Sequence, residues 1–162
     1  MATQTQTQQE FLEQFVGDWN FEGAACMPSG ESSEKFGGTE TYRRLGEHWV
    51  IGEGTGDTPG GGEKSSSVFT LGYDTDKETF VGSFICTMMN SLWVYTSGSL
   101  SEDGKTLTLD NEGPNFIAKD GSTAKYRDVF SFESPDHRTL TAFIQQPDGE
   151  WVQIMKSDYY RK

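Results

Sequence analysis

The sequence predicts an all-β protein: a ten-stranded antiparallel up-and-down β-barrel with a short N-terminal helix closing one end. Three observations predict it. Turn residues recur at short intervals, apolar residues alternate with period two between the turns, and no helical pattern of ten or more residues separates the strands. Because closing the sheet removes its exposed edges, a barrel is favoured over an open sheet. A two-sheet sandwich is the alternative, but sandwiches usually need longer crossovers.

The composition agrees with this fold and argues against several classes of partner. Hydrophobic residues make up only 33% of the 162 residues, whereas aromatic residues reach 13% and glycine occurs 19 times. Disordered chains lack aromatics, and many glycines suit a fold with many tight turns. The net charge of −12 makes this an acidic protein that repels phosphate backbones and anionic bilayers. We therefore expect neither nucleic-acid nor membrane partners.

The N-terminal residues 1–8 are polar and rich in Gln and Thr, and we expect them to be disordered, leaving 9–162 as a single domain. A helix is predicted over 8–16, where four residues share one apolar face and Gly17 can end the helix. Those four are Phe11, Leu12, Phe15 and Val16. The segment lacks the features of a signal peptide, and no stretch approaches 18 apolar residues, so we expect a cytoplasmic protein.

Nine turns separate the ten predicted strands. The strands are expected at 17–27, 35–45, 48–56, 65–73, 79–88, 92–100, 105–112, 123–133, 138–146 and 150–161. The turn at 28–30 carries a Pro-Ser-Gly run, and the glycine-rich loop 57–64 is expected to be the most flexible loop at the rim.

Residues that could carry metal or nucleophilic chemistry are few. His48 and His137 are the only histidines and show no zinc-like spacing, so we expect no metal and no cofactor. Cys26 and Cys86 are 60 residues apart, and we expect free thiols. There is no G-x-S-x-G elbow, and we predict no catalytic residues from these patterns.

Several strands mix large aromatic residues with polar ones on one face, which is typical of a pocket for an amphipathic molecule. We predict a ligand site in the barrel lumen with apolar walls and polar groups that orient one end of the ligand. The predicted walls are Trp19, Tyr42, Trp93, Tyr95 and Met155. The predicted polar groups are Glu40, Arg44, Glu53 and Arg127. The alternative is that these faces are cross-strand ladders on the outer surface.

The stretch 15–23, with its Gly-x-Trp, resembles the opening of lipocalin-like and fatty-acid-binding-like barrels. Further segments, over about residues 10–162, resemble the bacterial DUF1579 proteins of unassigned function. These segments are Gly38–Arg43, Leu45-Gly46, Leu71–Asp74, Gly98–Leu100, Lys105–Leu109, Lys125–Asp128 and Tyr159–Lys162. The resemblance implies a calycin-type barrel and no particular activity. The sequence departs from the pattern at Trp49-Val50, where Phe-Leu is usual, and we expect an altered pocket wall there.

Three hypotheses for function follow. The first is a non-catalytic barrel that binds a small, partly apolar molecule. The second is an isomerase or hydrolase that uses a buried carboxylate among Glu40, Glu53 and Asp128, whose pKa burial would raise. The third is a structural or assembly protein that forms a homodimer through outward-facing aromatic residues.

Overall fold

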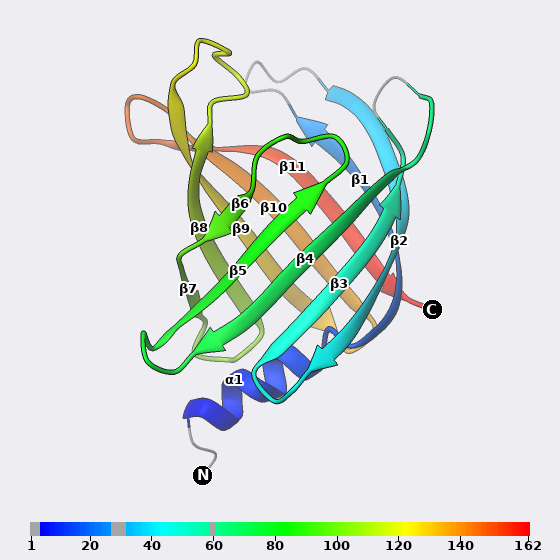
Figure 1. Ribbon diagram of the computed structural model, residues 1–162, viewed down its shortest axis with the longest axis vertical. Coiled ribbons are helices and arrows are strands. Elements are labelled where there is room, and N and C mark those ends of the chain that lie inside the picture. The colour runs from blue at the N-terminus through cyan, green and yellow to red at the C-terminus, as the bar shows by residue number, and fades with distance from the viewer. Residues whose placement is uncertain (1–3, 27–31, 59–60) are drawn as a thin grey trace.

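The computed structural model describes residues 4–26, 32–58 and 61–162. Over these residues the chain is an all-β antiparallel barrel, nearly closed, with one short helix beneath it (Figure 1). The elements are α1 (Gln4–Glu13), β1 (Gly17–Cys26), β2 (Ser32–Leu45), β3 (Trp49–Gly56), β4 (Ser65–Asp74), β5 (Thr79–Cys86), β6 (Trp93–Tyr95), β7 (Ser97–Leu100), β8 (Thr106–Pro114), β9 (Thr123–Ser134), β10 (His137–Gln145) and β11 (Trp151–Arg161). The predicted turn at 28–30 lies outside the described residues.

The strands follow one another as a meander, and β1 pairs with β11 to bring the two ends of the chain together. The described strands number eleven rather than ten. The strand predicted over 92–100 is interrupted at Thr96, because its first part pairs with β5 and its second part with β8. This break is the seam of the barrel. The Thr79 hydroxyl spans it, donating to the Gly98 carbonyl at 3.1 Å and accepting from the Gly98 amide at 3.0 Å.

The inward face of β3 is made of Val50 and three glycines rather than the larger residues between them. A Cβ on Gly52 would collide with the ring of Tyr42, and one on Gly54 would approach Glu40 Cγ to 3.1 Å. Glycine at these positions lets the large side chains of β2 lie across the neighbouring strand. Glu53, which the sequence predicts in the lumen, therefore lies on the outer face of β3.

Helix α1 begins at Gln4, inside the stretch expected to be disordered, and ends at Glu13 instead of residue 16. Phe11, Leu12 and Phe15 are fully buried beneath the barrel, as the apolar face predicted. The chain leaves the helix through turns that place Phe15 so that its carbonyl accepts a hydrogen bond from Trp19 Nε1 at 2.8 Å. Residues 14–16 are therefore needed for the connection to β1.

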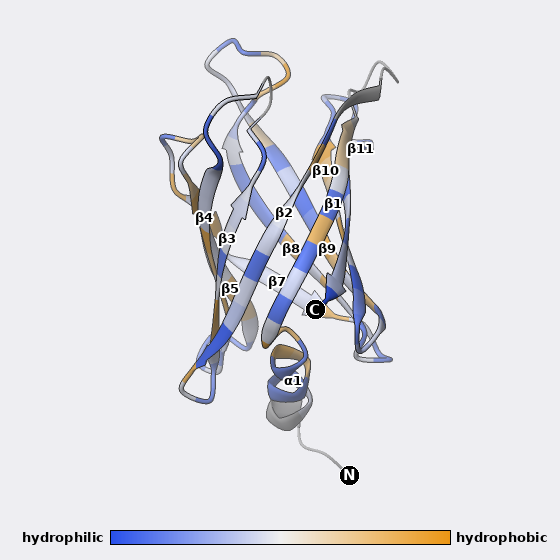
Figure 2. Ribbon diagram, turned by 90° about the vertical axis from the view of Figure 1, so that its right-hand side faces the viewer, coloured by the Kyte–Doolittle hydropathy of each residue, from blue (hydrophilic) through white to orange (hydrophobic). Residues whose placement is uncertain are grey.

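The two ends of the barrel differ. At the α1 end, the rings of Phe11 and Phe15 pack edge to face on Phe132, and Phe69 stacks on Phe130, so that these rings fill the interior. The loops β5–β6, β8–β9 and β10–β11 lie at the opposite end, which we call the mouth (Figures 1 and 2). Of the helices within the described residues, none is long and apolar enough to cross a bilayer.

Candidate functional site

A layer of polar side chains lies inside the barrel, above the aromatic packing at the α1 end. We call it the polar layer; it consists of Glu40, Tyr42, Tyr95, Asn111, Asp128, Arg138, Ser157 and Tyr159. Each member lies on the inward face of its strand, which it shares with buried or partly buried residues two positions away. Asp128, for example, lies two residues from both Tyr126 and Phe130, which are buried.

Arg138 is the most enclosed charge in the layer, with no exposed surface. Its guanidinium lies over the ring of Tyr159 at 3.9 Å and within about 5 Å of the rings of Phe15 and Trp19. Arg138 Nη2 is 3.6 Å from Glu40 Oε1, which is too far for a hydrogen bond, so the two groups attract as charges. No nitrogen of this guanidinium has a hydrogen-bond partner among the described residues.

Glu40 Oε2 accepts a hydrogen bond from the Tyr42 hydroxyl at 3.3 Å, whereas Oε1, which faces Arg138, has no hydrogen-bond partner within the described part of the chain. Burial raises the pKa of Glu40 above its ordinary value, although the Arg138 charge and the hydrogen bond from Tyr42 act in the opposite direction. Burial and the Glu40 charge also raise the pKa of Tyr159 well above 10.

Asp128 accepts a hydrogen bond from the hydroxyl of Tyr95. Burial raises the pKa of Asp128 to about 6, and the hydrogen bond from Tyr95 reduces that rise. The residue is only partly buried by exposed area, although it lies between the buried Tyr126 and Phe130. A deep residue that retains accessible surface lines a space inside the barrel.

Asn111 alternates with Leu107 and Leu109 on the inward face of β8 and is 6% exposed. Neither its Oδ1 nor its Nδ2 has a hydrogen-bond partner among the described residues. Buried amides are normally paired, so these two atoms are free to form hydrogen bonds with another molecule.

Above the polar layer, the inward positions toward the mouth differ between the two sides of the barrel. In β1, β3 and β4 they are mostly small: Gly23, Ala25, Gly54, Gly56, Ser65 and Ser67. In β6, β9 and β10 they include the large buried side chains of Trp93, Tyr126 and Ile144 as well as Ala124 and Ala142. Phe21, Phe36 and Phe84, which also face inward at this level, are only partly buried.

Six of the nine residues predicted for the site are inside the barrel, at different levels. Tyr42 and Glu40 lie in the polar layer, and Tyr95 joins it through Asp128. Trp93 lies nearer the mouth, with its ring 4.8 Å from that of Tyr126. The register places Met155 opposite the inward Ala142. Trp19 is fully buried in the floor.

The other three predicted site residues lie elsewhere. Glu53 is exposed on the outer face of β3. Arg127 also points outward, where its Nε donates to Asp110 Oδ1 at 2.8 Å and its guanidinium covers the ring of Trp151 at 4.3 Å. Arg44 lies at the α1 end, with its Nε 3.0 Å from Glu13 Oε2, and fastens the helix to β2.

The departure at Trp49-Val50 has a different consequence from the one expected. Trp49 is 37% exposed and packs over Gly72 on the outer surface, where a Cβ would collide with its ring. Val50 is the inward residue of the pair and is fully buried. The departure therefore changes the outer surface through Trp49 and the barrel interior only through Val50.

Sequence reasoning missed Arg138, Asn111 and Ser157 as members of this layer. A signal for each was present, because each falls on a face whose other members are apolar. Arg138 alternates with Leu140 and Ala142, and Asn111 with two leucines. The sequence predicts Asp128 as a candidate buried carboxylate, but Asp128 is not among the nine predicted ligand-binding residues.

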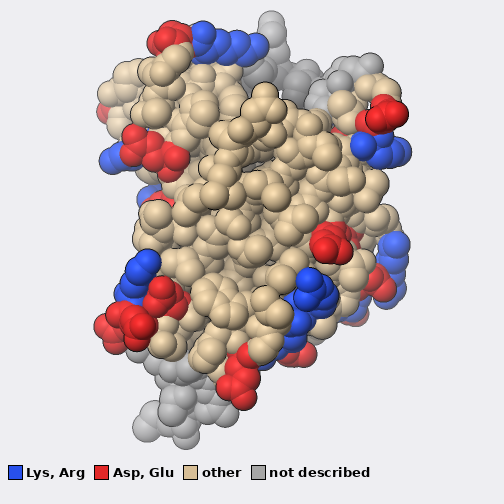
Figure 3. Space-filling view, viewed as in Figure 1, with Lys and Arg blue, Asp and Glu red and all other residues tan. Residues whose placement is uncertain are grey.

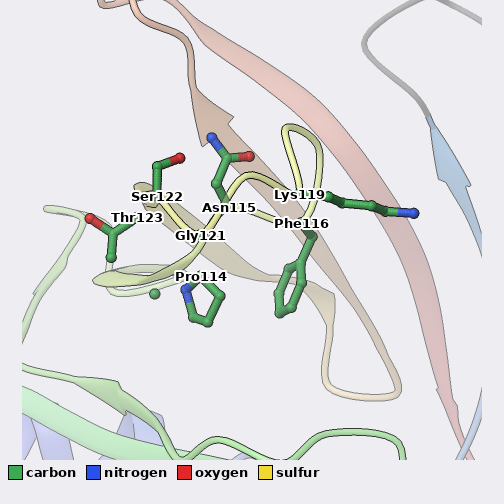
Figure 4. Close-up of a pocket in the computed structure, with 8 residues that line it drawn as sticks. Pro114, Asn115, Phe116, Lys119, Gly121, Ser122 and Thr123 are labelled. Carbon is green, nitrogen blue, oxygen red and sulfur yellow. The ribbon is translucent and has the colours of Figure 1, made fainter.

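A shallow pocket of about 430 Å³ lies within the β8–β9 loop (Figure 4). Its lining residues come almost entirely from this one loop: Gly113, Pro114, Asn115, Phe116, Lys119, Gly121, Ser122 and Thr123. The loop is fastened to the barrel because Tyr126 donates to the Pro114 carbonyl at 2.6 Å and accepts from the Phe116 amide at 3.2 Å. The Phe116 ring stacks on Trp93 at the mouth.

The outer face over β4 to β6 carries no Lys, Arg, Asp or Glu across a broad area (Figure 3). Its exposed apolar residues are Ile85, Met88, Leu92 and Val94. Elsewhere, no group of three or more potential metal ligands occurs among the described residues, and Cys86 carries a free thiol.

Comparison with known proteins identifies the family and the fold of the chain. Residues 4–161 match the model of DUF1579, described as a protein of unknown function. No curated protein matches the sequence. Among solved structures, the S-type phycobiliprotein lyase CPES from Guillardia theta is similar, with a TM-score of 0.63, 16% identity and coverage of 95% of this chain and 92% of that one.

Two further structures share the fold. Rv2717c from M. tuberculosis aligns with a TM-score of 0.62 and 11% identity, covering 100% of this chain and 99% of that one. EF1p2_mFAP2b, solved bound to DFHBI, aligns with a TM-score of 0.50 and 12% identity, covering 96% and 99%. At these identities the likeness shows a common barrel fold. Because the family model spans nearly the whole chain, the protein belongs to the DUF1579 family.

Proposed function

We propose that this protein binds a small, partly apolar molecule in the lumen of its barrel and that the molecule enters through the mouth. One observation carries the proposal: Glu40 and Asn111, which carry polar atoms without a hydrogen-bond partner among the described residues, lie inside a barrel whose inward residues in β1, β3 and β4 toward the mouth are mostly small. Ligand sites combine apolar walls with a few such polar groups. The structure of EF1p2_mFAP2b with DFHBI supports the idea that a barrel of this fold can hold a small molecule.

Blocking the lumen tests the proposal. Ala142 faces inward opposite Asp128, whereas its neighbour Thr141 faces outward. We expect Ala142→Phe to reduce the affinity for a lipophilic fluorescent dye at least about tenfold, and Thr141→Phe to leave it unchanged. Ser67→Phe, nearer the mouth, is a second blocking variant for use if Ala142→Phe is unstable. Absence of dye binding by the wild type, together with no bound molecule in native mass spectrometry, would contradict the proposal.

A second candidate is an isomerase or hydrolase that uses a lumen carboxylate for proton transfer. It is favoured by Asp128, whose pKa near 6 suits a group that exchanges protons near neutral pH. Carboxylate NMR titration of the wild type tests this premise. Titration of every Asp and Glu near 4 would rule it out.

A third candidate is a homodimer formed through the uncharged outer face of β4 to β6. The exposed Ile85 and Val94 on neighbouring strands favour it, as does the charge gathered on the rest of the surface. Sedimentation that shows a monomer at every concentration would exclude it.

A further inference from the structure

The proposed lumen site contains a recognition group more specific than its apolar walls. Resting on that proposed function, we propose that the ligand is a planar molecule carrying a lactam, a cyclic amide with adjacent N–H and C=O groups. Asn111 would hold the lactam beside Asp128.

The first step is the position of Asn111. It lies on β8 between Leu109 and Gly113, with its side chain toward the lumen, and Trp93 packs over Gly113 on the same face. Its carboxamide is nine-tenths buried, and both polar atoms lack a partner among the described residues. A buried amide in this state gains free energy from any molecule that supplies its hydrogen bonds.

The second step is what surrounds Asn111. Tyr95 belongs to β6 and Asp128 to β9, so the hydrogen bond between them passes over β8, the strand that carries Asn111. The register sets Asp128 opposite Leu109, which makes it a diagonal neighbour of Asn111 on the inward face. Because the Tyr95 hydroxyl donates its proton to Asp128, this proton is not available to the carboxamide of Asn111.

The third step is the chemistry of the unpaired groups. A carboxamide presents one acceptor and one donor group side by side, and its complement is a donor next to an acceptor. A cyclic amide has this arrangement, whereas an amine offers mainly donors and a carboxylate only acceptors. Because both amide atoms of Asn111 are unpaired, the argument holds for either orientation of the side chain.

The fourth step is shape and charge. Tyr126 is the residue paired with Asn111, and the Trp93 ring packs against both Tyr126 and Gly113, two residues from Asn111; flat surfaces of this kind favour a planar ligand. The Asp128 carboxylate and the net charge of −12 disfavour an anion. The structure thus points to an uncharged, planar lactam.

The test compares three probes of similar shape: 2-quinolone, 1-methyl-2-quinolone, which lacks the lactam N–H, and naphthalene, which lacks the lactam. We expect the wild type to bind 2-quinolone at least about tenfold more tightly than its N-methyl analogue in calorimetric titration. Asn111→Leu should bring this ratio close to one while naphthalene still binds. Asn20→Leu, at an exposed position on the outer face of β1, is the matched control and should keep the wild-type ratio.

The outcomes separate this inference from the function on which it rests. Equal affinity of the wild type for all three probes overturns the lactam and leaves lumen binding intact. Failure to bind both the probes and the lipophilic dye overturns both. If Asn111→Leu does not fold, nuclear Overhauser contacts between 2-quinolone and the Asn111 side-chain amide in the wild type decide the question. Their absence, or an ordered water retained on Asn111 in a crystal of the 2-quinolone complex, overturns the inference.

Discussion

The carboxyl group of Asp128 costs stability when it ionises, because burial favours its neutral form. Its pKa is about 6 in the folded protein, compared with an ordinary value of 3.8. The folded state therefore holds this proton more tightly than the unfolded state, so the contribution of Asp128 to stability decreases as pH rises from about 4 to about 6.

Asp128→Asn should therefore stabilise the protein at pH 7.5, by up to about 3 kcal/mol at 1.36 kcal/mol per pKa unit. The amide oxygen of Asn can still accept the hydrogen bond from Tyr95, and the gain should disappear at pH 4. Urea unfolding at the two pH values measures both free energies. Equal effects of the substitution at pH 4 and pH 7.5 would show that the carboxyl group is not perturbed.

Arg138 and Glu40 are a buried ion pair with no direct hydrogen bond between them. We expect Arg138→Met to cost about 3–5 kcal/mol at pH 7, because Glu40 is then buried without its counter-charge. The double variant Arg138→Met/Glu40→Gln should be more stable than Arg138→Met alone. Urea unfolding of the four proteins in this cycle gives the coupling energy, and additive single effects would mean that the two charges do not interact.

At the residue scale, the alternation of residues along a strand identified the inward face where that face carries the larger side chains. It placed Glu40 and Tyr42 correctly because their strand alternates large inward residues. It failed at Glu53, because the inward positions of β3 are glycines that make room for the Tyr42 ring, and packing across strands is invisible in a single strand's pattern. It also failed at Arg127, which cannot share a face with its neighbour Asp128.

At the scale of elements, the barrel and the meander were predictable from the turns, but the eleventh strand was not. Residues 93–100 alternate like one continuous strand. Their hydrogen bonds divide at Thr96 because the barrel closes there, and closure is a property of all the strands together. The helix was predicted from its apolar face, but its bounds were displaced because residues 14–16 form the connection to β1.

The seam depends on one side chain, because Thr79 both donates to and accepts from Gly98 across it. Thr79→Val removes both hydrogen bonds while conserving shape, and we expect it to destabilise the protein by about 1–3 kcal/mol. We also expect this substitution to accelerate amide hydrogen exchange in β6 and β7 more than in the other strands. Thr108→Val on the outer face of β8 is the matched control. Unchanged exchange in β6 and β7 would show that the seam is held by other contacts.

At the scale of the molecule, the interior and the surface are organised differently. The interior changes along the barrel axis, from packed rings at α1 through the polar layer to a mouth end that is lined by small residues in β1, β3 and β4 and by larger ones such as Trp93 and Tyr126 elsewhere. The surface instead carries an excess of negative charge, with an uncharged area over β4 to β6 (Figure 3). The interior therefore carries the proposed ligand site, whereas the surface charge affects how the stability of the protein responds to solution conditions.

A net charge of −12 on a chain of 162 residues opposes the folded state, because folding brings like charges closer together. Salt screens this repulsion, with a Debye length that falls from about 30 Å at 0.01 M to about 10 Å at 0.1 M ionic strength. We therefore expect the thermal midpoint at pH 7.5 to rise by several degrees when NaCl is increased across this range. The same titration near pH 4.5, the isoelectric point, is the control, because there the net charge is close to zero. A midpoint at pH 7.5 that falls with salt would mean that specific ion pairs, such as Arg44–Glu13 and Arg127–Asp110, outweigh the overall repulsion.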